Sequence, residues 1–284
     1  MAPLREGTVR LGDGRTLAYA EWGDPRGTPV LHFHGIPGSR LERHTDDRMY
    51  ARLGLRYVTI DRPGYGRSDP LAGRSFLDWA SDVSSLVADL GIDRFRLFAV
   101  SGGAPFALAV GSALGARVEG ITIVSGVGPS DRPGAFRGMD LTERANYWAA
   151  PRFPRTTAMI THAFLGGAAH ASDLVARAAS HAGMTVAARA VEARALSEQL
   201  REALRQGARA TVWENVLCAQ PWGFSLASVA SPVQLWHGER DHVCPLHHAE
   251  YVASALPHAT LTLRRGGHFL VLRYAEEALR ALIA

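Results

Sequence analysis

Phe95-Arg-Leu-Phe-Ala-Val-Ser-Gly-Gly103 is the stretch that decides the fold, because an apolar β run ends in it on Ser101. The alanine-rich segment 104–114 that follows predicts a helix. A turn this abrupt leaves no room for side chains on either flank, which accounts for Ala99 and Gly103. The Ser101 hydroxyl is therefore expected on a strained turn beside a helix N-terminus, as a candidate nucleophile. Glycine-rich turns of this kind also hold phosphates, so the motif alone leaves both chemistries open.

Composition describes a globular chain. Its 284 residues, 47% of them hydrophobic, suffice for a full core. No apolar run approaches the roughly 20 residues that span a bilayer, and no signal peptide is apparent, so we expect a soluble, cytoplasmic protein. Two cysteines, Cys218 and Cys244, form neither a disulfide framework nor a zinc pattern, and we expect no metal.

The net charge of +4 is spread over dispersed arginines, which indicates solvated helix faces. We therefore expect no nucleic-acid partner and no membrane partner. The expected partner is a small-molecule substrate, bound by a monomer or a homodimer.

Strands alternate with helices on both sides of Ser101, which predicts an α/β fold with a mostly parallel, doubly wound central sheet. A hairpin over 7–22, turning at Asp13-Gly14, is expected at its antiparallel edge. The predicted strands are 29–33, 57–60, 95–100, 118–124, 233–237 and 259–263, and the predicted helices include 76–90, 104–114 and 246–256.

The residue pattern changes between about 129 and 228. Runs of β-branched residues are absent there, and apolar residues recur with helical periodicity, as in 168–180 and 185–206. We therefore predict a core domain of residues 1–128 and 229–284 that is split by an all-helical cap of residues 129–228. An active site is expected between the two.

A nucleophilic serine needs a base, and the base needs a carboxylate that orients it. In a parallel sheet these groups come from loops at the carboxyl ends of strands. Asp241 follows the strand 233–237, and His268 follows the last strand in a glycine-bracketed loop. The order Ser101, Asp241, His268 is the one expected when the nucleophile sits on a strand-to-helix elbow, and these three are the predicted catalytic residues.

Backbone N–H groups have to stabilise the oxyanion that forms when the serine adds to a carbonyl. The loop after the strand 29–33 carries Gly35 and Gly38 around Ile36, so its backbone can face the site. We expect the N–H groups of Ile36 and Gly102 to form this oxyanion hole.

The chain resembles the capped α/β-hydrolase fold proteins of the esterase, peptidase and dehalogenase type. The resemblance implies a serine nucleophile, a cofactor-free site and a cap that sets substrate choice. Haloalkane dehalogenases and epoxide hydrolases have an aspartate at the elbow, so Ser101 argues against both. The matching motifs are His34-Gly-Ile-Pro-Gly-Ser39, Asp61-Arg-Pro-Gly-Tyr-Gly-Arg-Ser68, Ala99-Val-Ser-Gly-Gly103, His237-Gly-Glu-Arg-Asp241 and Gly266-Gly-His-Phe269.

The predicted function is a serine hydrolase that cleaves a carboxylic ester, thioester or lactone through an acyl-enzyme intermediate. One alternative is a non-hydrolytic tailoring enzyme, a lyase or cyclase, that uses only the pocket and the base. Another is a ligand-binding member without turnover. An aminopeptidase is a further alternative, for which Glu198, Glu202 and Glu214 are the candidate amine-binding carboxylates.

Several residues have competing interpretations. Asp131 is the rival acid, and His34 is expected to be buried and bonded to backbone rather than catalytic. Asp61 and Asp69 are expected to tie down their own loop, and Cys244 to be an inert buried thiol. The histidines that compete with His268 are His32, His237, His242, His247 and His248.

Aromatic residues of the predicted cap have two interpretations, because helical aromatics are usually buried by packing. We predict that Gly35, Trp148, Trp213 and Trp222 contact substrate, with core packing as the alternative for each tryptophan. Phe164, Phe224 and Met159 share this ambiguity.

Overall fold

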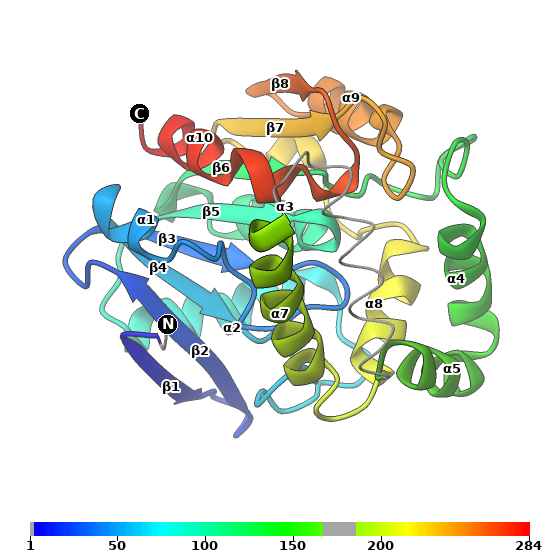
Figure 1. The fold of residues 1–284 in the computed structure, drawn as a ribbon, viewed down its shortest axis with the longest axis horizontal. Coiled ribbons are helices and arrows are strands. Elements are labelled where there is room, and N and C mark those ends of the chain that lie inside the picture. The colour runs from blue at the N-terminus through cyan, green and yellow to red at the C-terminus, as the bar shows by residue number, and fades with distance from the viewer. Residues whose placement is uncertain (1–2, 167–185) are drawn as a thin grey trace.

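The computed structural model describes residues 3–166 and 186–284, and eight strands form one sheet in the order β1-β2-β4-β3-β5-β6-β7-β8 (Figure 1). β1 and β2 form the predicted antiparallel hairpin, β2 is also antiparallel to β4, and the remaining pairs are parallel. The predicted mostly parallel, doubly wound sheet is therefore confirmed. The strands are β1 Arg5–Arg10, β2 Thr16–Gly23, β3 Thr28–Phe33, β4 Leu55–Ile60, β5 Phe95–Val100, β6 Val118–Val124, β7 Val233–Gly238 and β8 Ala259–Arg264.

Helices cover both faces of the sheet. α2, α3 and α9 pack on one apolar face, and α1 and α10 pack on the other. α10 shows why these segments are helical, because its buried residues Ala275, Ala278, Leu279 and Leu282 recur at the spacing of one helix face. The bounds are α1 Arg48–Arg52, α2 Phe76–Asp89, α3 Ala104–Ala113, α9 Leu246–Ala255 and α10 Val271–Ile283.

α1 has no counterpart among the helices expected from the sequence. It is five residues long, which is too short for a helical period to be visible. Its buried residues Met49 and Tyr50 fix it to the sheet, where the Tyr50 ring stacks on Tyr57 at 4.1 Å between centroids.

The chain between β6 and β7 carries α4, α5, α7 and α8, which we call the helical insertion. Figure 1 shows α4, α5 and α8 beyond the arrowheads of β5 and β7. The described residues of this interval hold no strand, and α7 matches the predicted helix 185–206. The predicted helix 168–180 lies outside the described residues, and the division into core and cap domains stays a prediction. The bounds are α4 Leu141–Arg152, α5 Pro154–Gly166, α7 Val186–Ala203 and α8 Arg209–Cys218.

None of the helices within 3–166 and 186–284 has the length and apolar character required to cross a membrane.

The turn from β5 to α3 brings backbone against backbone. Residues Ser101–Gly103 form a single 3₁₀ turn, and Ser101 has a φ of 53°. A Cβ atom on Gly103 would collide with the carbonyl oxygen of Phe33 and lie 2.9 Å from that of His34. Glycine at this position therefore allows α3 to begin directly against the end of β3.

The substitution Gly103→Ala is expected to destabilise the fold by about 1 to 3 kcal/mol or more, because backbone atoms cannot move aside as a flexible side chain does. Urea unfolding measures the loss. Gly115→Ala is the control, since a methyl group there meets no atom within 4 Å. Equal unfolding midpoints for the two variants would contradict this account of the turn.

Candidate active site

Ser101 occupies a strained backbone position. Its φ of 53° lies in the left-handed region, which residues with a Cβ rarely adopt and which is common at functional sites. Its carbonyl oxygen accepts hydrogen bonds from the N–H groups of Ala104 and Val127. These bonds hold the turn, and they confirm the strained elbow predicted from the glycines around the serine.

His268 lies in the loop after β8 and contacts Ser101 directly. Its Nε2 lies 2.9 Å from the Ser101 Oγ, and its Nδ1 lies 2.9 Å from Oδ2 of Asp241. The loop can approach this closely because residue 238 is glycine. A Cβ atom there would lie 2.7 Å from the carbonyl oxygens of Gly266 and Gly267 and would push the loop away. The glycines thus bring the loops after β7 and β8 into backbone contact.

Asp241 is buried and fully bonded. Its Oδ1 accepts the N–H groups of Val243 and Cys244, both at 2.9 Å, which leaves Oδ2 for the His268 ring. An ionised carboxylate accepts only, so Nδ1 of His268 carries the proton that it donates to Asp241. Nε2 is then free to accept the hydroxyl proton of Ser101, which is the tautomer that a general base requires.

Asp241 and His268 shift each other's pKa. Burial lowers the pKa of His268, but Asp241 outweighs it and holds that pKa above the ordinary 6.5. For Asp241, burial raises the pKa, and the His268 ring together with its hydrogen bonds brings it below the ordinary 3.8. The two shifts agree in direction, since each group favours the charged form of the other.

The loop after β3 lies against Ser101. A Cβ on Gly35 would lie 3.6 Å from the Ser101 Cβ, and one on Gly102 would collide with the Ile36 side chain. Within the described residues the Ile36 N–H has no acceptor, and the Gly102 N–H lies in the first turn of a helical segment. These two N–H groups belong to residues next to Ser101 in space or in sequence, and their role as an oxyanion hole stays a prediction.

The sheet, the elbow and the loop motifs agree with a match to known proteins. Residues 28–273 match the alpha/beta hydrolase fold family. The chain belongs to this family. Solved structures of the same fold include an esterase from Thermogutta terrifontis, with a TM-score of 0.70 and 18% identity over 98% of this chain and 97% of that one. An enol-lactonase from Burkholderia xenovorans has a TM-score of 0.71 and 14% identity, covering 98% of each chain.

The similarity to curated relatives covers only part of this α/β-hydrolase. A proline iminopeptidase from Xanthomonas citri is 34% identical over 116 residues, which is 38% of this chain and 36% of the relative. A non-heme chloroperoxidase from Streptomyces lividans is 34% identical over 125 residues, 43% of this chain and 45% of that protein. The chain therefore matches less than half the length of either relative.

The rival residues of this α/β-hydrolase have other partners. Asp131 is exposed, whereas Asp241 is the carboxylate at His268. His34 is fully buried, and its Nδ1 lies 2.8 Å from the Gly35 carbonyl oxygen, as expected for a structural histidine. The other histidines bond elsewhere: His32 to Glu42 and Tyr57, His237 to the Cys244 carbonyl, His242 to Gly138, and His247 and His248 to Ala135.

Asp61 and Asp69 hold their loop, as predicted. Asp61 accepts the N–H groups of Arg40 and Arg67, and Asp69 accepts that of Thr16. The predicted inert thiol Cys244 is buried, which raises the pKa of its thiol.

Of the predicted substrate-contacting residues, Gly35 lies against Ser101. Trp222 is buried in the core, where its ring meets Phe76. Trp148 is 56% exposed on α4, and the Trp213 indole donates to the Arg74 carbonyl. Trp222 therefore agrees with the packing alternative, whereas Trp148 lies at the surface, and substrate contact by the tryptophans stays a prediction.

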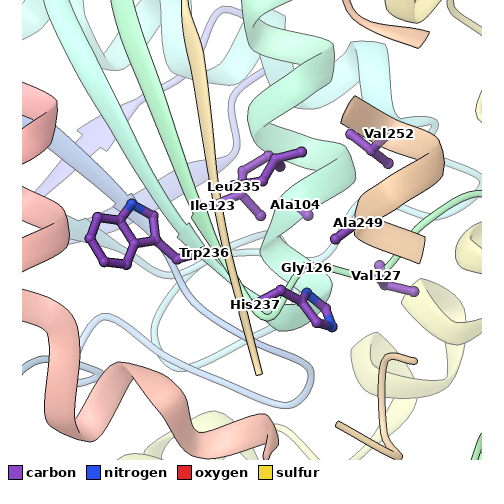
Figure 2. A pocket seen from close by; sticks show the side chains of 9 residues that line it. All are labelled: Ala104, Ile123, Gly126, Val127, Leu235, Trp236, His237, Ala249 and Val252. Atoms are coloured by element: carbon purple, nitrogen blue, oxygen red, sulfur yellow. The ribbon is translucent and has the colours of Figure 1, made fainter. Parts of the chain in front are cut away.

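A small apolar cavity lies behind the site, between β6, β7, α3 and α9 (Figure 2). Figure 2 shows His237 at its edge, while Ser101, Asp241 and His268 are not among its lining residues. The cavity is therefore a packing feature between the sheet and the helices α3 and α9, and Ser101 does not line it.

We expect the His268 imidazole to titrate above its ordinary value of 6.5, and Asp241→Asn to lower its pKa, because burial then acts without the opposing charge. Histidine NMR across pH 4 to 9 measures both values. Asp131→Asn is the control that removes an exposed carboxylate in the same chain. An unchanged His268 pKa in Asp241→Asn would remove the electrostatic link between the two residues.

Proposed function

We propose that this protein is a serine hydrolase that cleaves a carboxylic ester, thioester or lactone of a small molecule through an acyl-enzyme intermediate. The observation that carries the proposal is the 2.9 Å contact from His268 Nε2 to Ser101 Oγ, with Asp241 bonded to the other ring nitrogen. Three helices of the helical insertion, α4, α5 and α8, lie beyond the arrowheads of β5 and β7, and the insertion is the proposed source of substrate selectivity (Figure 1).

Acylation begins as Ser101 Oγ attacks the carbonyl carbon while His268 Nε2 takes the hydroxyl proton. The carbonyl oxygen gains the negative charge, and the N–H groups of Ile36 and Gly102 donate to it. The imidazolium then gives its proton to the leaving oxygen or sulfur as the bond to the acyl carbon breaks. Asp241 stabilises the imidazolium throughout by accepting its Nδ1 proton.

Deacylation repeats these steps with water as the nucleophile. His268 Nε2 accepts a proton from the attacking water, and the same backbone donors receive the second oxyanion. Collapse breaks the bond to Ser101 Oγ, which regains its proton from Nε2. The acid product leaves, and the enzyme returns to its starting state.

Ser101→Ala is expected to lower the hydrolysis of short-chain p-nitrophenyl esters by about 10⁴-fold or more, because the attacking atom is lost. Steady-state kinetics gives the ratio, and mass spectrometry tests for a fluorophosphonate adduct on Ser101. Ser112→Ala is the matched control, since Ser112 lies near the other end of α3 and bonds to Ser228.

Two outcomes would count against the proposal. Equal turnover by Ser101→Ala would favour a lyase or cyclase that uses only the pocket and the base. A wild-type enzyme that neither turns over esters nor forms the phosphonate adduct would favour a ligand-binding role.

An aminopeptidase is the second candidate, and Glu143 is the observation that favours it. Glu143 lies on α4, whose first turn is tied to the Asp241 loop by the bond from the Asp140 N–H to the His242 carbonyl, at 2.7 Å. Burial raises the pKa of its carboxyl, and the nearby His268 partly opposes that rise. Within the described residues Glu143 has no ion-pair partner, so a substrate ammonium group is a suitable one.

The carboxylates predicted for this role have other partners. Glu214 is buried against Arg62 and Arg74, and Glu202 pairs with Arg40. Glu198 is half exposed and pairs with Arg194. Glu143 was missed by the sequence interpretation, and its only local signal is its place in the first turn of a helix.

Under the aminopeptidase candidate, p-nitroanilides of L-alanine and L-proline are cleaved, whereas their N-acetyl forms are not. Glu143→Gln should lower kcat/KM for the free amines by about tenfold or more, since a charge-assisted bond is lost. Hydrolysis of p-nitrophenyl acetate should change little. Glu198→Gln is the control, and an equal loss on the neutral ester would reject amine recognition by Glu143.

A further inference from the structure

Arg62 joins the helical insertion to the loop after β3, residues 34–39, which we call the oxyanion loop. Its guanidinium is fully buried after β4 and forms a two-point ion pair with Glu214 of α8, Nε to Oε1 and Nη2 to Oε2, both at 2.7 Å. Its other hydrogen bonds run to the loop after β3. Nη1 donates to the His34 carbonyl at 2.5 Å, and Nη2 donates to the Gly35 carbonyl at 3.0 Å.

The bond from Arg62 to Gly35 helps to set the direction of the Ile36 N–H, together with His34, whose Nδ1 lies 2.8 Å from the same carbonyl oxygen. The Gly35–Ile36 peptide is planar and trans, so its C=O and N–H point in opposite directions. With the carbonyl held toward Arg62, the N–H is held away from it. Gly35 lies against the Ser101 side chain, and the Ile36 N–H has no acceptor within the described residues. The Arg62 charge also polarises the peptide, which strengthens its N–H as a donor.

Glu214 is what allows a guanidinium to remain at this buried place. Burial raises its pKa, but Arg62 and Arg74 outweigh that effect and hold the carboxyl below its ordinary value. The carboxylate also accepts from Arg74 Nη2 at 2.8 Å and from the Tyr65 hydroxyl at 2.9 Å. Without it, neither buried guanidinium would have an ion-pair partner in the part of the chain that the structure describes.

We propose that the Glu214–Arg62 ion pair is a positioning device for the oxyanion hole: the carboxylate of α8 fixes the guanidinium, which holds the Gly35 carbonyl and thereby aims the Ile36 N–H. Neither side chain touches the reacting atoms. This inference rests on the proposed hydrolase function, since it assigns how one of the two oxyanion donors is oriented.

The test measures the oxyanion itself. A trifluoromethyl ketone labelled with ¹³C at its carbonyl adds to Ser101 and forms a hemiketal, whose pKa by ¹³C NMR reports how well its oxyanion is stabilised. In Arg62→Met we expect that pKa to rise and kcat for p-nitrophenyl acetate to fall by about 10²- to 10³-fold, the loss typical of one oxyanion donor. KM should change little, because the interaction forms only in the transition state.

Arg74→Met is the matched control. It removes an equally buried guanidinium from the same carboxylate, yet Arg74 bonds to the Pro63 carbonyl and to no atom of the oxyanion loop. We expect the hemiketal pKa of Arg74→Met to stay near the wild-type value even if this variant is less stable to heat than the wild type. Arg62→Lys keeps the charge but has a single donor nitrogen. Its hemiketal pKa should lie between those of wild type and Arg62→Met, and it serves as the test variant if Arg62→Met does not fold.

The outcomes separate this inference from the function on which it rests. Equal hemiketal pKa shifts in the Arg62 and Arg74 variants, or an unmoved hemiketal pKa in the Arg62 variants, would overturn the positioning role. Loss of the adduct in Ser101→Ala would show that the hemiketal forms on Ser101. A normal His268 titration in the Arg62 variants would show that the base is intact in them. A wild-type protein that forms no adduct would reject both proposals.

Discussion

The approach of one backbone to another at the β5–α3 turn is the constraint on which the site depends. Gly103 lies against the carbonyl of Phe33, and Gly102 lies against the Ile36 side chain. These contacts bring the end of β3 and the start of α3 together and leave Ser101 between them. The strained φ of Ser101 follows from this arrangement, because the chain must reverse from strand to helix within the space of one residue.

Buried charge fixes the helical insertion on the sheet. Arg40 donates to Asp61 at 2.8 Å and to Glu202 of α7 at 2.6 Å, and Gln206 donates to the carbonyls of Gly66 and Ser68. Each such pair gives up hydration, so its net gain in stability is small, but its directional bonds define one relative position. The insertion therefore meets the loop after β4 through ion pairs and hydrogen bonds as well as through apolar packing.

The sequence was sufficient for the parts of the site that lie at strand ends. Ser101, Asp241 and His268 each follow a strand that its own apolar run reveals, and parallel strands gather their carboxyl ends at one edge. The family match over 28–273 agrees with the predicted fold. Local patterns were insufficient where a side chain's role depends on a distant partner. Glu214 was a candidate for amine binding, yet Arg62, 152 residues earlier in the chain, neutralises it.

Trp222 illustrates the same limit for apolar residues. The sequence predicted Trp222 within an all-helical segment, where an aromatic residue has the same pattern whether it faces substrate or core. The structure places it in the loop after α8, buried and in contact with Phe76.

β6 and β7 are neighbours in the sheet, so the insertion leaves and re-enters the fold at adjacent positions. An engineer who wished to change specificity could thus exchange the whole segment for that of another member without altering strand order. The grafted segment would have to meet one structural requirement. It would have to supply an acidic residue where Glu214 now meets Arg62 and Arg74, or the chimera would bury two guanidinium groups without the carboxylate that pairs with both.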